Sequence, residues 1–217
     1  MEIKIKAIDA FEAFKAVVLA ASREEDREHM NCVLVEIEGS TIRTVATNGH
    51  WLAKWEAPGV VVETDRDGSL SIPLPIVKIL LKTIKPMVRS MPGAPVTIRD
   101  GELEFPGGSL SFATVTDKFP PWRKTIPTPN GSAPSCVGLD TKYLKDVSAS
   151  FRVRVTGQES APIVMQLTGE LDPILITSEQ VRELTVIVMP IRIESERYAA
   201  TKKAAKKAVK SALKKAA

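Results

Sequence analysis

Few side chains in this 217-residue chain are of the types that carry out catalysis. The sequence has two histidines, His29 and His50, and two cysteines, Cys32 and Cys136, and no CxxC or Cys/His spacing joins them. No P-loop, GxSxG or HExxH motif is present. The cysteines are therefore interpreted as buried thiols in a reducing compartment, and the sequence predicts no metal site.

Two acidic pairs are the remaining candidates for acid-base chemistry. Asp65 and Asp67 lie in a predicted turn, and Glu102 and Glu104 lie in a predicted hairpin. Solvated charge is the usual explanation for acids in such places. We therefore expect neither an enzyme nor a cofactor.

Lysine is concentrated at one end of the chain. Residues 198–217 form a Lys/Ala-rich segment without an acid, and its lysines are Lys202, Lys203, Lys206, Lys207, Lys210, Lys214 and Lys215. Subtracting the +7 of this tail from the net charge of +4 leaves −3 for residues 1–197. Charge repulsion and the missing apolar face predict a tail that is disordered when free.

Several lysines together favour binding to nucleic-acid phosphates, because they release counterions. A solubilising tail and an anionic membrane surface remain alternatives, since lysine clusters do not select among polyanions.

The stretch from Ala46 to Ala53 predicts a hairpin between two strands. Asn48 and Gly49 favour a type I′ turn, because both residues tolerate a positive φ. Trp51 and Trp55 follow at strand spacing on one side, and Leu52 points to the other. Taken alone, this pattern is typical of aromatic side chains that fill a core.

The elements around this hairpin predict a repeating order. A strand at residues 3–7 precedes an amphipathic helix that starts near the capping-box pair Asp9 and Glu12. Strands at 32–38, at 41–47 and through Glu56 complete the first unit. The second unit has a strand at 70–72, a helix from Pro73 that Pro86 closes, and strands at 95–99, 102–105 and 110–115. Ile76, Ile79, Leu80 and Ile84 form the apolar face predicted for that helix.

The same order appears once more after residue 135. A strand at 136–139, a helix capped by Asp140, and strands near 152–156, 163–167, 174–177 and 184–193 are expected. The fold class predicted is α+β, with about three β-α-β-β-β units, each about 60 residues long, whose helices cover one face of antiparallel sheets. The predicted domains are residues 1–127 with two units, a linker at 128–135, a half-domain at 136–193 and the basic tail at 194–217.

Localisation is predicted to be cytoplasmic and nucleoid-associated. The N-terminus carries no signal-peptide pattern, and the longest apolar run, Ala16 to Ala21, is too short to span a membrane. We therefore expect no membrane partner.

Three stretches in this order resemble the bacterial DNA sliding clamp, the β subunit of DNA polymerase III. They are ATNGHWLA at 46–53, KFPPWRKTIP at 118–127 and VIVMPIRI at 186–193. Residues 1–127 resemble that family's middle domain, and residues 136–193 resemble only the second half of its third domain. Trp51, Pro121, Trp122 and Asn48 depart from the residues usual at their positions.

The resemblance implies a hydrophobic groove for short linear peptides of polymerases, the clamp loader or repair proteins. Adaptable apolar side chains with a few polar groups suit such a groove. The residues carried over are Met30, Thr47, Gly49, His50, Trp51, Leu52, Pro120, Lys124, Thr125, Ile187, Met189, Pro190, Ile191 and Arg192. Proline is confined to edge strands or bulges, so the strand that ends in Met189 and Pro190 is also interpreted simply as the edge of a sheet. This interpretation is compatible with the groove.

The resemblance also implies a DNA-facing helix surface. Candidate lysines on the second and third helices are Lys78, Lys82, Lys85, Lys142 and Lys145, whereas Lys15 on the first is nearly alone. Solvated helix faces carry lysines in any case. The parts of the family that close its ring are missing here. The resemblance implies rings of twelve units, so three units per chain reach that number only as a tetramer, a homo-oligomer that needs a new interface.

The sequence thus predicts a reduced sliding-clamp-like protein of DNA replication or repair. It recruits partners through the groove and holds DNA with its tail. The alternative is a chromatin-like or regulatory DNA-binding protein that does not form a ring and uses the clamp fold as a scaffold.

Overall fold

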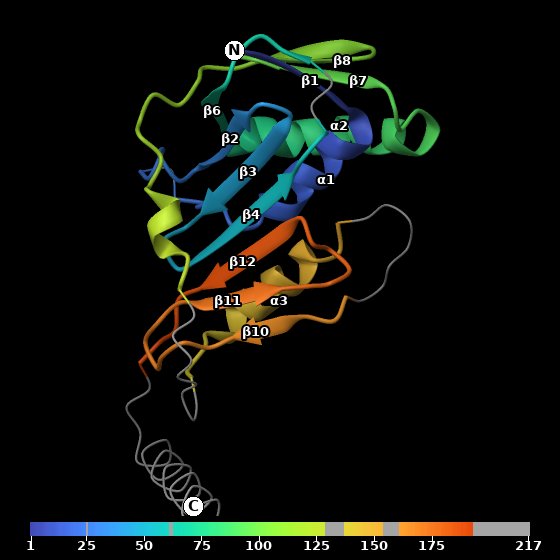
Figure 1. The fold of residues 1–217 in the computed structure, drawn as a ribbon. Helices are drawn as coiled ribbons and strands as arrows, with labels where there is room; N and C mark the ends of the chain where they lie inside the picture. The colour runs from blue at the N-terminus through green and yellow to red at the C-terminus, as the bar shows by residue number, and fades with distance from the viewer. Residues whose placement is uncertain (25, 61–62, 129–136, 154–160, 193–217) are drawn as a thin grey trace, which may run out of the picture.

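The computed structural model describes residues 1–24, 26–60, 63–128, 137–153 and 161–192. These residues form two antiparallel sheets with helices packed against them (Figure 1). The α+β fold class is therefore confirmed. The predicted linker beyond residue 128 and the whole predicted tail, with its seven lysines, lie outside the described residues.

The first two units follow the predicted order. The first contains β1 (Glu2–Lys6), α1 (Ala7–Val17), β2 (Cys32–Glu38), β3 (Thr41–Thr47) and β4 (Trp51–Ala57). A short strand that was not predicted, β5 (Glu63–Thr64), precedes the second unit. The second contains β6 (Gly68–Pro73), α2 (Leu74–Ser90), β7 (Pro95–Arg99), β8 (Glu102–Phe105) and β9 (Gly108–Ser111), and the 3₁₀ helix η1 (Trp122–Thr125) follows it.

The third unit is less regular than predicted. It contains α3 (Thr141–Ser150), β10 (Val164–Gln166), β11 (Ile174–Thr177) and β12 (Leu184–Val188). Of the strands predicted at 136–139 and 152–156, the described residues 137–139 and 152–153 are not in strands, and the others lie outside the described residues.

Strand pairing joins the units to one another. The five-stranded sheet has the order β5-β1-β7-β8-β9, and the seven-stranded sheet has the order β10-β11-β12-β4-β3-β2-β6. In the larger sheet Ile187 of β12 pairs with Leu52 of β4, which attaches the third unit to the first. The proposed boundary between a domain and a half-domain is therefore bridged by backbone hydrogen bonds.

The main core lies between the two sheets and around α1 and α2. Phe14 of α1 is fully buried there with Ile3, Ile72 and Ile98 from the sheets. Small residues recur on the buried face of α1, which lets the helix approach β3 and β4 closely. The Thr44 hydroxyl of β3 donates to the Ala13 carbonyl of α1 at 2.8 Å, which fixes this contact in a buried place.

The start of α1 differs from the prediction. No side chain caps the helix, so the proposed capping box at Asp9 is wrong. Instead the Ala7 and Ile8 N–H groups donate to backbone carbonyls of Ala94 and Pro92 at 2.7 and 3.1 Å. The turn before β7 therefore satisfies the helix terminus, which local sequence does not reveal.

The helix α2 continues past the proline predicted to end it. Pro86 lies inside the helix on its exposed side, and Val88 extends the buried stripe by another turn. Burial of that stripe outweighs the missing backbone hydrogen bond of proline. The predicted core position Ile79 is also wrong, because its side chain is exposed and Val77 is buried in its place.

The last strands of the second and third units end earlier than predicted. β9 ends at Ser111 and not at residue 115. β12 ends at Val188 and not at residue 193, since Pro190 has no N–H to continue a ladder.

Candidate peptide-binding surface

The turn between β3 and β4 is built around the side chain of Asn48. Its Oδ1 accepts hydrogen bonds from the His50 and Trp51 N–H groups at 3.0 and 3.1 Å. Within this turn only Gly49 has a positive φ, of 85°, whereas a type I′ turn requires one at Asn48 as well, so the predicted turn type is wrong. The Thr47 hydroxyl accepts from the Gly49 N–H and donates to the Trp51 carbonyl, which closes the turn.

Trp51 and Leu52 point to opposite faces of the large sheet. Trp51 is only 2% exposed and belongs to the core around the helices. Leu52 is 4% exposed and belongs to a second cluster on the other face. The structure therefore confirms the predicted alternation but does not bring Trp51 to the proposed groove.

This second cluster, here called the outer cluster, is covered by the segment that contains η1. Its members are Cys32, Leu34, Val45, Leu52, Phe119, Trp122 and Ile187. Phe119 and Trp122 come from the segment before and within η1, and they lie over side chains of four strands. The three sequence motifs therefore meet at one place on the sheet.

An ion pair holds the covering segment on the sheet. The Arg123 guanidinium donates to both carboxylate oxygens of Glu36, at 3.0 and 2.8 Å. The same guanidinium stacks on the Trp122 ring, 4.3 Å from its centroid. Sequence analysis missed this pair, because the two partners are 87 residues apart.

Three exposed apolar side chains follow members of the outer cluster closely in the chain. Met189 is 39% exposed, Ile191 is 43% exposed and Ile126 is 38% exposed. The Met189 N–H donates to the His50 carbonyl at 2.8 Å, so the end of β12 is joined to the hairpin turn. Ile126, Met189 and Ile191 are here called the rim. A buried apolar floor with an exposed apolar rim can hold the side chains of a peptide.

The other predicted groove residues have mixed positions. Lys124, Thr125 and Arg192 are exposed, Pro120 and Pro190 are half-buried, and Thr47 is buried with its hydroxyl engaged in the turn. Met30, just before β2, is half-buried, and Gly49 is exposed.

The ring of His50 contacts α3 of the third unit. Its ring stacks on Tyr143 of α3, with centroids 5.7 Å apart and planes 22° apart. His50 thus lines a depression of about 330 Å³ between the turn, the segment after α1 and α3. Its role as a groove residue stays a prediction, and its carbonyl accepts a hydrogen bond from the Met189 N–H.

The proposed DNA-facing lysines of α2 share one exposed face. Lys78, Lys82 and Lys85 recur at helical spacing, and all three are exposed. Lys15 of α1 donates to the Val153 carbonyl at 3.2 Å just beyond α3. Burial, together with the nearby charge of Lys85, lowers the pKa of Lys15. Lys15 is therefore held by the segment after α3 and lies within reach of the charge of Lys85.

On α3, Lys142 is tied to its surroundings and Lys145 is exposed. Lys142 pairs with Asp140 at 3.0 Å and lies over the Tyr143 ring at 4.7 Å. Hydrogen bonds from the Lys142 backbone and side chain lower the pKa of Asp140, which caps the helix as predicted.

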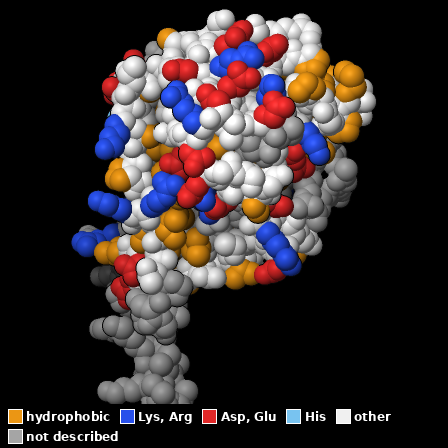
Figure 2. All heavy atoms as spheres, turned by 45° about the horizontal axis from the view of Figure 1, so that its top comes forward, with side chains coloured by type: hydrophobic (Ala, Val, Ile, Leu, Met, Phe, Trp, Pro, Cys, Tyr) orange, Lys and Arg blue, Asp and Glu red, His pale blue; other side chains and the backbone are white. Residues whose placement is uncertain are grey.

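The acidic pairs have structural roles at the surface of both sheets. Asp65 accepts from the Glu2 N–H at 2.7 Å, and Asp67 accepts from the Gly39 N–H at 2.8 Å. Figure 2, which turns the top of the molecule forward, shows basic and acidic side chains close together. The hydrogen bonds that the Arg99 guanidinium donates to the carboxylates of Glu2 and Glu104 raise the pKa of Arg99.

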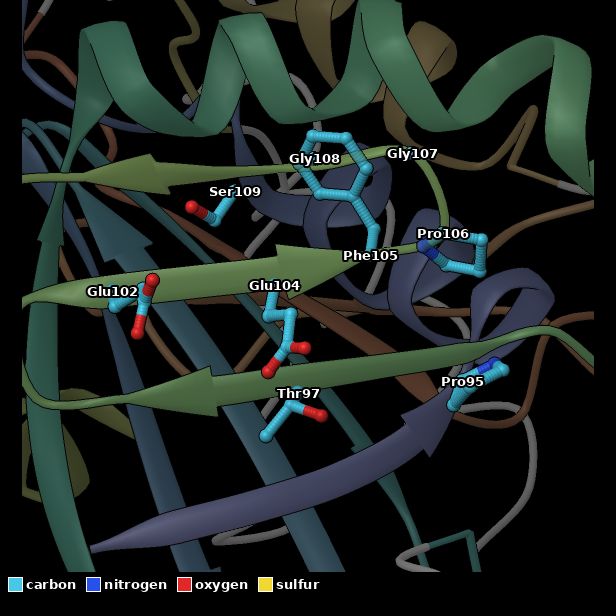
Figure 3. A pocket seen from close by; sticks show the side chains of 9 residues that line it. All are labelled: Pro95, Thr97, Glu102, Glu104, Phe105, Pro106, Gly107, Gly108 and Ser109. Atoms are coloured by element: carbon cyan, nitrogen blue, oxygen red, sulfur yellow. The ribbon is translucent and has the colours of Figure 1, made fainter.

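Glu102 and Glu104 project from β8 on the same side as Thr97 of β7 (Figure 3). Both carboxylates pair with Arg99, at 3.6 and 2.7 Å. They line a depression of about 500 Å³ that Pro95 and the turn at Gly107 complete. Ion pairs with Arg99 at the solvent-exposed surface therefore account for the presence of Glu102 and Glu104.

Neither a metal centre nor a membrane span occurs in the described part of the chain. No group of three or more His, Cys, Asp and Glu side chains there is placed to hold a metal ion. No helix there is both long and apolar enough to cross a bilayer. Burial raises the pKa of the free Cys32 thiol to about 11, so it stays protonated.

Helices packed against antiparallel sheets in a repeated unit define the class of the DNA clamps. Residues 4–120 match the family described as the central domain of the DNA polymerase III beta subunit, and the chain belongs to this family. Members of this family are not enzymes, in agreement with the expectation for this chain. No curated protein sequence matches the chain significantly.

Solved clamp structures share the fold at low sequence identity. The DNA polymerase III beta subunit of Thermotoga maritima is 16% identical, with a TM-score of 0.71 over 89% of this chain. The Pseudomonas aeruginosa subunit is 15% identical with a TM-score of 0.70, and the clamp of that organism bound to griselimycin is 15% identical with a TM-score of 0.69, each over 89% of this chain. The chain covers 66% of the length of each of these structures.

Proposed function

We propose that this protein is a reduced sliding-clamp-like factor that recruits partner proteins to DNA through the outer cluster and its rim. The observation that supports this proposal is the meeting of three distant segments at one apolar surface. Leu52 and Ile187 pair across β4 and β12, and Trp122 packs over both. The ligand is a short linear peptide with apolar side chains, carried by a polymerase, clamp-loader or repair protein.

The rim determines what kind of ligand fits. Met189 offers a flexible, polarisable side chain, and Pro190 leaves the neighbouring strand edge without one donor. A peptide places its apolar side chains over Ile187 and Leu52 and finds its polar partners in backbone groups and in Arg192. Because Trp122 already fills part of the outer face, the peptide lies beside it.

Fluorescence polarisation with a labelled clamp-binding peptide tests this proposal. Met189→Ala and Leu52→Ala are expected to weaken binding by about tenfold or more, as for residues at the centre of an interface. Ile79→Ala is the control, because Ile79 is similarly exposed but lies on α2. Unmeasurable binding to the intact chain, or binding that neither groove variant changes, contradicts the proposal.

DNA binding is proposed for the lysines of the tail and of the helix face. Each lysine that neutralises a phosphate steepens the dependence of affinity on salt, so the seven tail lysines together give a logarithmic slope of about −6 at most. Lys78, Lys82 and Lys85 extend this contact to the folded part. Gel shifts with the full chain and with a chain ending at Arg197 separate the two contributions.

The concentration of charge in the tail also supports the second candidate, a DNA-binding protein that does not form a ring. In that case binding to linear DNA is lost with the tail, and substitution of the three α2 lysines by glutamine has no effect. Retention on circular but not on linear DNA instead supports encirclement.

A further inference from the structure

The outer face of the large sheet has an apolar half and a charged half. Leu34 of β2 is one of the strand residues of the outer cluster, which form the apolar half. Glu36 follows Leu34 at strand spacing, so its side chain lies on the same face, where the charged half begins. Arg43 of β3, which lies opposite Glu36 in the strand register, donates to Glu38 at 2.7 Å and to Glu56 at 2.8 Å. Glu36 therefore borders the outer cluster, and its carboxylate binds a partner outside the sheet.

The partner of Glu36 is the covering segment, which comprises residues 118–126. Both carboxylate oxygens accept from Arg123, and Oε1 also accepts from the Trp122 Nε1–H at 3.5 Å. The Glu36 side chain is 17% exposed, whereas that of Arg123 is 57% exposed. Among the described residues, each side-chain hydrogen bond that joins the covering segment to the sheet ends on this carboxylate. The polar attachment of the segment therefore depends on one side chain.

Further hydrogen bonds of the covering segment lie within it. The Thr125 hydroxyl donates to the Trp122 carbonyl at 2.7 Å, which closes the turn of η1. Such bonds fix the shape of the segment but not its position on the sheet. That position depends on the burial of Phe119 and Trp122 in the outer cluster and on the contacts with Glu36.

Arg123 connects the ion pair with the tryptophan ring. Its guanidinium lies 4.3 Å from the centroid of the Trp122 ring, which is 5% exposed. A guanidinium that donates to both oxygens of one carboxylate has a fixed plane, and that plane orients the ring stacked on it. Ile126 of the rim belongs to the same segment, so its position also depends on this attachment.

We propose that Glu36 is a positioning residue of the peptide surface, whose carboxylate holds the covering segment on the sheet before a peptide arrives. The inference rests on the proposed function and deepens it, because it names the group that prepares the site. A peptide that lies beside Trp122 needs this ring in place. When the segment is on the sheet for only part of the time, the apparent affinity falls in proportion to that fraction.

Loss of the Glu36 charge is expected to affect peptide binding more than stability. An ion pair whose arginine is more than half exposed contributes little to the free energy of unfolding, because solvent screens it. The same pair spares the peptide the entropic cost of ordering the covering segment.

Fluorescence polarisation with a labelled clamp-binding peptide compares the full chain with Glu36→Gln, Arg123→Gln and the double variant. Each single variant is expected to bind about fivefold more weakly, as for a segment that is in place about one-fifth of the time. The double variant is expected to bind like either single variant, because both remove the same contact. Glu38→Gln is the matched control, since Glu38 lies on the same strand but binds Arg43, and its affinity is expected to change by less than about twofold.

Acrylamide quenching of tryptophan fluorescence reports the position of the covering segment. Trp51, Trp55 and Trp122 are the three tryptophans of the chain, and all are at most 5% exposed. Glu36→Gln is expected to increase the quenching, and the increase is expected to disappear when Trp122→Phe is added. The urea midpoint of Glu36→Gln is expected to equal that of Glu38→Gln.

The outcomes separate this inference from the proposed function. If the full chain does not bind the peptide, the proposed function is contradicted and the positioning role is overturned with it. If the full chain binds and both single variants bind within about twofold of it, only the positioning role is overturned. Weaker binding of Glu36→Gln without increased quenching, or with a urea midpoint well below that of Glu38→Gln, also overturns the positioning role, because direct contact or general destabilisation then explains the loss.

Discussion

The substitution Trp51→Ala tests whether this side chain belongs to the core or to the peptide surface. Trp51 is 2% exposed and contacts the core around the helices. A buried tryptophan removes roughly 200 Å² from water, which is worth about 5 kcal/mol at 25 cal/mol per Å². An unfolded state that is already compact lowers this value, and the cavity that the missing indole ring leaves raises it. We therefore expect a loss of about 4 kcal/mol in the free energy of unfolding.

Urea denaturation followed by circular dichroism measures this loss, with Ile79→Ala as a control expected to change stability by less than about 0.5 kcal/mol. Peptide affinity of folded Trp51→Ala is expected to stay within about threefold of the unchanged chain, since the ring points away from the outer cluster. A loss below about 1 kcal/mol, combined with peptide binding weakened tenfold, would refute the placement of Trp51.

Three further substitutions or modifications test individual contacts. Thr44→Val is expected to lower the free energy of unfolding by about 1 kcal/mol, because it removes the buried hydrogen bond to Ala13, whereas Thr44→Ser retains most of it. Pro86→Ala is expected to raise the unfolding free energy by about 1 kcal/mol or more, since it restores a helix hydrogen bond at an exposed position, and an unchanged urea midpoint argues against this. Cys32 is expected to react with iodoacetamide about 100-fold more slowly in the native chain than in the unfolded chain, because its pKa rises from 9.0 to about 11, and mass spectrometry of its peptide measures both rates.

The repeating order of elements was predictable where each pattern is local. Strands β2 and β3 occur at the predicted residues, because alternating apolar side chains and the turn at Gly39 define them. The placement of Trp51 and Leu52 on opposite faces of the sheet was equally predictable. The assignment of Trp51 to a groove was not, because the sequence does not say which face of the sheet the helices cover.

The features that sequence analysis missed depend on distant parts of the chain. α1 starts at Ala7 because carbonyls of residues 92 and 94 accept its N–H groups. α2 passes through Pro86 because Val88 is buried beyond it. The Arg123–Glu36 pair joins two motifs that are far apart in sequence. In each case a tertiary contact overrides a local preference.

The proposed sites were predicted in part. The outer cluster and rim combine Leu52, Ile187 and Met189 as expected, because strand pairing brings their segments together. The stacking of His50 on Tyr143 of α3 was not predictable, because the two residues are far apart in sequence. The role of the tail lysines stays a prediction.

The central claim is that a partner peptide lies on the outer cluster, and photo-crosslinking locates it directly. A clamp-binding peptide with a benzophenone group at its apolar position is bound to the full chain, irradiated, and mapped by mass spectrometry. We predict crosslinks within residues 120–126 and 187–192, foremost at the exposed Met189. Crosslinks confined to the five-stranded sheet, for example to β8, would contradict the claim.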